Sequence, residues 1–185
     1  VYNHQRPISE TWHYKLAQRH NMTYRNYGIN GCCIAFDRRG KGYGMSVLQR
    51  FKHMNDTADY VLVIAGHNDA HLIQNNIDSL KMFSDSLATL CTGLRAKYQH
   101  SKIVFVTPWK VDNTGFTQII NTIKDVCREH NIPVLDAANE SGILVNDDKF
   151  RSRYFQNHGM GDHAHLSDEG HNLLVDWAER FLEGI

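Results

Sequence analysis

The chain has 185 residues, a length that suits one domain with a substantial hydrophobic core. Lysine plus arginine equals aspartate plus glutamate, at 20 each, so the charge balance does not indicate a nucleic-acid partner or an anionic membrane surface. No apolar run approaches the roughly 18 residues that a membrane-spanning helix needs. The cysteines Cys32, Cys33, Cys91 and Cys127 lack the spacing of a zinc site, so buried free thiols are expected.

In the first third of the chain, the spacing of apolar residues predicts two helices and one strand. Ser9 is expected to cap a helix that ends near His20. Loose alternation predicts a short strand over residues 22–29, followed by a glycine-rich loop. A second helix is expected over residues 45–54.

The rest of the chain alternates between apolar strands and longer helices. Near-continuous apolar runs at residues 60–65 and 102–107 are typical of parallel strands buried on both faces. The further elements expected are a helix over residues 77–98, a helix over 116–130, a short strand over 133–136 and a last helix from Ser167 to Leu182. This alternation indicates βαβ units. The sequence therefore predicts an α/β fold of a single domain, with a parallel, flavodoxin-like sheet between helices on both faces (three-layer α/β/α).

The segment from Asp162 to His171 has the clearest catalytic pattern. Asp162 precedes His165 by three positions, just ahead of the last predicted helix, so one turn brings the carboxylate to the imidazole Nδ1–H. The carboxylate then fixes the tautomer and stabilises the imidazolium, which leaves Nε2 free to act as a general base. A base held in this way implies a nucleophile elsewhere.

Two further polar segments follow the predicted strands 22–29 and 60–65. In open parallel sheets the site forms at the carboxyl ends of the strands. Gly31 offers a backbone N–H without a side chain in the way, and Asn68 offers a side-chain NH₂, so both are candidate donors to an oxyanion. Asp69 is expected to hold the turn at Asn68 through hydrogen bonds to the backbone.

These motifs, in this order, resemble the SGNH/GDSL hydrolase family from about Trp12 to the end of the chain. The family has four blocks: a GDS serine, a glycine, a G-x-N-D and a D-x-x-H. The matches are Gly31 to the second block, Gly66, Asn68 and Asp69 to the third, and Asp162 and His165 to the fourth. The resemblance implies a serine ester hydrolase that needs no cofactor and no metal. Its substrate would be a small acyl ester, with acetyl groups on carbohydrate as one candidate. The implied roles are His165 and Asp162 in catalysis, Gly31 and Asn68 in the oxyanion hole, and Gly66 and Asp69 in support.

The first block of that family is missing from the sequence. Gly-Asp-Ser occurs nowhere, and no G-x-S-x-G elbow replaces it. Residues 1–185 are therefore expected to form a domain of this family without its first strand, with the serine roughly ten to twenty residues upstream of Val1. A strand of this kind buries about four aliphatic side chains worth about 2 kcal/mol each. Because that sum rivals the stability of a whole domain, residues 1–185 alone are expected to fold poorly.

Three other interpretations stay open. A non-catalytic binding domain on the same scaffold would follow if the upstream block lacked its serine, although such a domain has no need for an oriented base. A metal-dependent hydrolase would use the many histidines. His67 and His71 are four positions apart, which suits metal ligation on a helix, but an Asn-Asp segment directly after a strand predicts poor helical geometry. The third is Cys32 as a nucleophile paired with His165.

Overall fold

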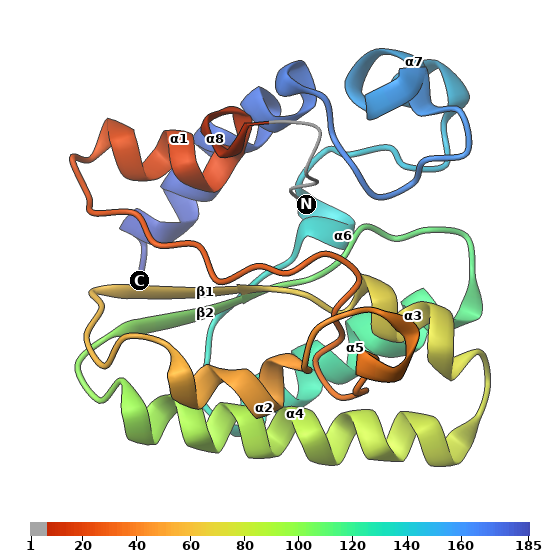
Figure 1. Ribbon diagram of the computed structural model, residues 1–185. Coiled ribbons are helices and arrows are strands. Elements are labelled where there is room, and N and C mark those ends of the chain that lie inside the picture. The colour runs from red at the N-terminus through yellow and green to blue at the C-terminus, as the bar shows by residue number, and fades with distance from the viewer. Residues whose placement is uncertain (1–6) are drawn as a thin grey trace. The chain divides into compact units, whose positions relative to one another are not determined.

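A computed structural model describes residues 7–185 of the protein (Figure 1). The described chain forms two compact units. Unit 1 contains the N-terminal segment up to Gly28 together with Glu140–Ile185, and unit 2 contains Ile29–Asn139. The strand and serine expected upstream of Val1 lie outside the 185 residues and stay a prediction.

Unit 2 contains a three-stranded parallel sheet in the order β1 (Tyr60–Ile64), β2 (Lys102–Val106) and β3 (Val134–Leu135). β1 and β2 pair along their whole length, from Tyr60 opposite Lys102 to Ile64 opposite Val106. β3 continues the sheet with Leu135 opposite Val106. All three strands lie where the sequence predicts them, and the predicted α/β fold with a parallel sheet is confirmed.

The two longer strands differ in burial. In β2, every residue after Lys102 is buried, as predicted for a strand covered on both faces. In β1, Val63 is buried but Ile64 is 36% exposed, so the same prediction is wrong for this strand. Within the described sheet, β1 pairs with β2 alone and is an edge strand. An apolar run therefore identified the strand but not its place in the sheet.

Helices cover the sheet of unit 2. They are α2 (Val47–Arg50), α3 (His67–Ile73), α4 (Ile77–Lys97), α5 (Thr114–Glu129) and α6 (Ala137–Glu140, whose last residue belongs to unit 1), with 3₁₀ turns at Arg39–Lys41 and Phe51–His53. α4 and α5 are the two long helices that the sequence predicts, and they lie together on one side of β1 and β2 (Figure 1). Their apolar faces form one core with Val63, Ile103 and Phe105 of the strands. All four cysteines are buried and free, as expected.

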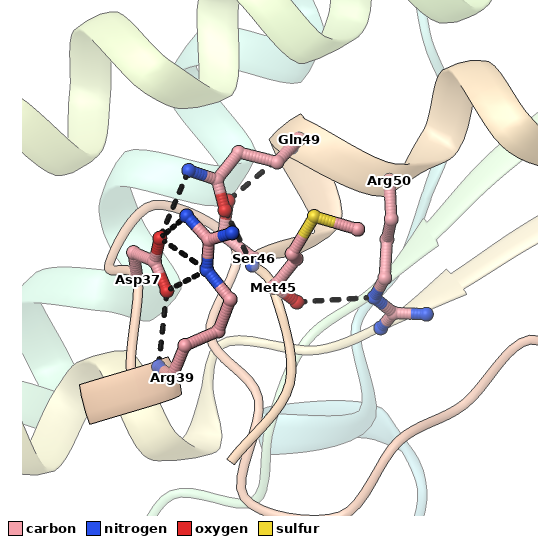
Figure 2. Close-up of polar contacts among 6 residues, drawn as sticks. All are labelled: Asp37, Arg39, Met45, Ser46, Gln49 and Arg50. Atoms are coloured by element: carbon pink, nitrogen blue, oxygen red, sulfur yellow. Dashed lines mark hydrogen bonds and ion pairs between the residues drawn. The ribbon is translucent and has the colours of Figure 1, made fainter. Parts of the chain in front are cut away.

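The helix predicted over residues 45–54 is shorter than expected, and its start is well defined. Ser46 Oγ accepts the backbone N–H of Gln49 at 3.2 Å, and Gln49 Oε1 accepts the N–H of Ser46 at 3.1 Å, which is a capping box. The Gln49 amide also donates to Asp37, whose carboxylate binds the guanidinium of Arg39 (Figure 2). These bonds join the 3₁₀ turn to the start of α2.

Unit 1 is helical, with α1 (Trp12–Arg19), α7 (Asp148–Tyr154), α8 (Asp168–Glu183) and 3₁₀ turns at Ile8–Glu10 and Gln156–Gly159. α1 packs against α8, and the exposed sides of the two helices are joined by ion pairs, such as Arg19 with Glu179 at 2.6 Å. The buried ring of His171 on α8 accepts the first backbone N–H of α1, from Trp12, at 3.4 Å. His171 therefore has a structural role. No helix among residues 7–185 is long and apolar enough to cross a membrane.

Two N-terminal predictions are wrong. Ser9 does not cap α1, because it lies in the 3₁₀ turn Ile8–Glu10 and Thr11 is the residue before the helix. Residues 22–29 form no strand, and Tyr27 stays 37% exposed. The side chain of Asn26 accepts the backbone N–H of Gly28 at 2.9 Å. This local bond offers the backbone a partner other than a neighbouring strand.

Candidate active site

Asp162 and His165 lie in the loop before α8, and their side chains are in contact. Nδ1 of His165 is 3.0 Å from Oδ2 and 3.1 Å from Oδ1 of Asp162. Oδ1 also accepts the backbone N–H groups of Ala164 at 2.8 Å and of His165 at 2.9 Å. The carboxylate therefore holds both the turn and the ring, and the contact predicted from the three-residue spacing is confirmed. A ring that donates from Nδ1 leaves Nε2 free to accept a proton.

The surroundings of Asp162 favour its charged form. Burial of the side chain, which is 15% exposed, opposes ionisation of the carboxyl. The hydrogen bonds from the His165 ring and from the two backbone N–H groups outweigh this effect and lower the pKa of Asp162. The side chain of His165 is 30% exposed, so solvent and small molecules can reach it.

The loop that carries His165 is fixed by bonds to residues 154–156. Phe155 and Leu166 form an antiparallel bridge. The backbone N–H of Gln156 donates to the carbonyl of His165 at 2.9 Å, and its side-chain amide donates to Leu166 O at 3.1 Å. An added Cβ at Gly170 would be 2.2 Å from the carbonyl oxygen of Tyr154, so this close approach requires glycine. No local pattern in the sequence indicates Gln156 as a support for this loop.

In unit 2, the end of β1 leads directly into α3 through Gly66. Gly66 has φ +108°, and a Cβ there would be 3.1 Å from Ile119 and 3.2 Å from Ile123, so the turn requires glycine. Asn68 follows in the first turn of α3. Its Nδ2 donates to the carbonyl oxygen of Cys32 at 3.1 Å. Since the amide has two N–H groups, the second remains for another acceptor.

Asp69 is fully buried and binds the loop that follows Gly31. Oδ2 accepts the backbone N–H of Ile34 at 2.9 Å, and Oδ1 accepts that of Ala35 at 3.0 Å. Burial raises the pKa of Asp69 to about 6, although these bonds favour the charged form. Asp69 therefore has a long-range structural role, in place of the local one predicted for the turn at Asn68.

Gly31 occupies a position that only glycine fits. Its φ is +72°, and an added Cβ would be 2.0 Å from Cδ1 of the Tyr43 ring. Because the Asn68 amide binds the carbonyl of the next residue, Cys32, the two expected oxyanion donors lie in one bonded segment of unit 2. The neighbouring thiols are buried, and burial raises the pKa of Cys33 to about 12, so it stays protonated near neutral pH. Cys32 is 7% exposed, and a nucleophilic role for it would require the loop to open.

The histidine-rich segment after β1 is helical, which corrects the geometry expected for it. His67 and His71 lie on α3 with ring centroids 5.1 Å apart, and both rings pack edge-on against Phe116. Burial lowers the pKa of His71. In the part of the chain that the structure describes, no group of three or more His, Cys, Asp or Glu residues is placed to hold a metal ion. His67 and His71 therefore pack against an aromatic ring at the surface of unit 2, with His67 half-buried and His71 exposed.

Comparison with known proteins identifies the class to which this fold and these motifs belong. Residues 3–173 match the model of the GDSL-like Lipase/Acylhydrolase family. The match covers most of the chain, including Gly31, the Gly66–Asp69 segment and the Asp162/His165 pair. The chain belongs to this family of hydrolases. No curated protein matches the chain in sequence.

Solved structures share the fold at low sequence identity. A protein from Lactobacillus plantarum is 18% identical with a TM-score of 0.79, over 94% of this chain and 88% of that one. A member of the lipolytic G-D-S-L family from Veillonella parvula is 15% identical with a TM-score of 0.64, over 96% and 90%. A catalytic mutant of an acetylxylan esterase from Geobacillus stearothermophilus is 16% identical with a TM-score of 0.66, over 92% and 80%.

Proposed function

We propose that this protein is a serine ester hydrolase in which His165 is the general base and Asp162 orients it. The observation that carries the proposal is the contact of His165 Nδ1 with both carboxylate oxygens of Asp162, at 3.0 and 3.1 Å. A domain that only binds a ligand has no need for this arrangement. The nucleophile in the proposal is a serine upstream of Val1, as expected from the family's first block.

The proposed reaction has two halves. The serine Oγ attacks the ester carbonyl while His165 Nε2 takes its proton, and the imidazolium then protonates the leaving alcohol. Water attacks the acyl-enzyme by the same route and releases the acid. The backbone N–H of Gly31 and the amide of Asn68 are the proposed donors to the oxyanion. Each such donor contributes about 3 kcal/mol to the stability of the transition state.

Small acyl esters are the proposed substrate class, with acetyl groups on carbohydrate as a specific candidate. The fold similarity to an acetylxylan esterase supports this choice. No long apolar segment for an extended acyl chain is evident in the sequence. Acetyl esters of xylo-oligosaccharides and p-nitrophenyl esters of increasing acyl length would test it, with turnover expected to fall as the acyl chain lengthens.

The decisive experiment labels the natural protein that carries these 185 residues with a fluorophosphonate probe. Intact mass and peptide mapping then locate the adduct. We expect one adduct on a serine upstream of Val1. The absence of any adduct, in a folded protein without a GDS serine, would favour a non-catalytic binding domain on this scaffold.

The matched pair H165A and H163A tests the base. H165A should lose both probe labelling and ester turnover, because nothing then takes the serine proton. H163A removes a neighbouring imidazole from the same loop and should retain both. Turnover of H165A at the wild-type rate would remove His165 from the mechanism.

A further inference from the structure

The segment that carries Gly31 is a tight turn with a defined peptide orientation. The backbone N–H of Cys32 donates to the carbonyl of Ile29 at 3.3 Å, which closes a four-residue turn. Gly31, the third residue, has φ +72°, whereas Asn30 is not among the residues with positive φ. A positive φ at the third residue alone is the pattern of a type II turn. In this turn the N–H of the third residue takes no part in the closing bond, and no hydrogen bond of the described residues uses the N–H of Gly31.

The direction of this N–H depends on the turn staying closed. The Gly31 carbonyl and the Cys32 N–H that closes the turn belong to one peptide, so a contact to that carbonyl also holds the closing peptide. Glycine at the third position has wide conformational freedom once the turn opens. A contact to this peptide therefore helps to keep the N–H of Gly31 in one direction.

Arg38 makes that contact. Its Nη1 donates to the carbonyl oxygen of Gly31 at 2.7 Å. The guanidinium carbon also lies 4.0 Å from the centroid of the Tyr43 ring, and that ring occupies the space next to Gly31. The three residues are thus in mutual contact. Arg38 binds the carbonyl of Gly31, and the Tyr43 ring packs against both the guanidinium and the glycine.

One donor of the Arg38 guanidinium does not contribute to the stability of the fold. Its Nε is buried and has no hydrogen-bond partner in residues 7–185. A buried donor without a partner costs free energy, and its presence calls for an explanation other than packing. Asn68 and Asp69 already bind the next part of the same loop, at Cys32 and at Ile34–Ala35. Gly31 itself is held by Arg38.

We propose that Arg38 is a positioning residue for the oxyanion hole. Its bond to the Gly31 carbonyl holds the peptide that closes the Ile29–Cys32 turn, so that the N–H of Gly31 stays directed at the oxyanion. This inference rests on the proposed function of Gly31 as a donor. Arg38 itself touches neither the substrate nor the reacting atoms in this proposal.

The adjacent Arg39 provides a matched control. Its Nε and Nη2 bind the carboxylate of Asp37, and its side chain is 60% exposed (Figure 2). The variants R38M and R39M therefore remove the same charge from neighbouring positions. R38K keeps a cation that can donate one bond to the Gly31 carbonyl.

The kinetic test uses the natural protein and an acetyl ester. R38M should lower kcat by about tenfold with KM within about twofold, because the loss falls on the transition state. R38K should recover part of the loss, and R39M should match the wild type. If R38M keeps the wild-type kcat while N68A loses it, the proposal for Arg38 is wrong and the proposed oxyanion hole stands.

Amide hydrogen exchange measured by NMR gives a result that does not depend on activity. The amide of Cys32 closes the turn, so its exchange should be about tenfold faster in R38M and unchanged in R39M. Unchanged protection of Cys32 in folded R38M would overturn the proposal. A wild-type protein without esterase activity would instead refute the proposed function, while the exchange result would still show whether Arg38 holds the turn.

Discussion

Two aspartates of this protein hold backbone N–H groups in nearly the same way, yet they have opposite pKa shifts. Asp69 in unit 2 accepts two backbone N–H groups and is fully buried, and burial raises its pKa to about 6. Asp162 in unit 1 also accepts two backbone N–H groups, but it is partly exposed and also binds an imidazole, and its pKa is lowered.

The comparison shows how burial and hydrogen bonding together decide what a carboxylate can do. For Asp69 the cost of burial exceeds the benefit of two bonds, so its contribution lies in fixing the loop that carries Gly31. For Asp162 the added bond to His165 reverses the balance and keeps the carboxylate charged. A charged carboxylate stabilises the imidazolium that forms when a histidine acts as a general base.

The largest expected effect is that of D162N. An amide in place of the carboxylate no longer favours the Nδ1–H tautomer, so kcat should fall by about 10⁴ with little change in the unfolding temperature. Steady-state kinetics on p-nitrophenyl acetate would measure it. D176N removes an exposed carboxylate of α8 and is the control. A loss of less than tenfold in D162N would mean that Asp162 is structural, as Asp69 is.

N68A should lower kcat by about 10² to 10³, because an oxyanion donor is removed. It should also cost about 1 kcal/mol of unfolding free energy, since the bond to Cys32 O is lost with it. N76A removes the side-chain cap of α4 and should cost a similar stability without loss of kcat. Equal kcat values for the two variants would exclude Asn68 from the oxyanion hole.

D69A should act mainly on stability. The N–H groups of Ile34 and Ala35 would be left unpaired, which should cost about 3 kcal/mol of unfolding free energy. Urea denaturation measures this cost. A change below about 1 kcal/mol would show that water or a rearranged loop replaces the carboxylate.

The two aspartates should also differ in pH dependence. Since the pKa of Asp69 in the folded state is about 6 and its unfolded value is about 3.9, the folded state binds this proton more tightly, and its contribution to stability falls as pH rises from about 4 to 6. The difference in unfolding free energy between wild type and D69N should therefore change by up to about 3 kcal/mol between pH 4 and 7. Asp162 has the opposite sign, because its contribution is complete above its unfolded pKa and is lost as pH falls through its lowered folded pKa. If the difference in unfolding free energy between wild type and D69N did not change with pH, the raised pKa of Asp69 would be contradicted.

The smallest effect expected is that of S167A. Ser167 caps α8 two positions after His165, with its Oγ accepting the N–H of Gly170 at 3.2 Å. Its loss should cost about 1 kcal/mol of stability. kcat below the unfolding temperature should not change, because the loop that carries His165 keeps its bonds to Gln156. A large loss of kcat would show that the helix start also positions the base.

The prediction of elements from the sequence succeeded where the pattern was long. β2, α4, α5 and α8 lie where periodicity and capping residues place them, because extended apolar patterns and caps are local signals. α3 was missed, since His, Asn and Asp are weak helix formers. Its Asn68 and Asp69 side chains bind residues 32–35 instead, and tertiary contacts of this kind override propensity.

The sequence by itself determined the Asp162–His165 contact, because the two residues are three positions apart and one turn is enough to join them. It also indicated Gly31 and Asn68 as donors through their order and their place after predicted strands. The tertiary structure alone decided the role of Asp69, the hydrogen bond from Arg38 to Gly31 and the edge position of β1. Asp69 is 35 positions away from Ile34 in the sequence and 34 away from Ala35, and the bond from Arg38 to Gly31 depends on the path of the loop between them. No local pattern encodes such a pairing.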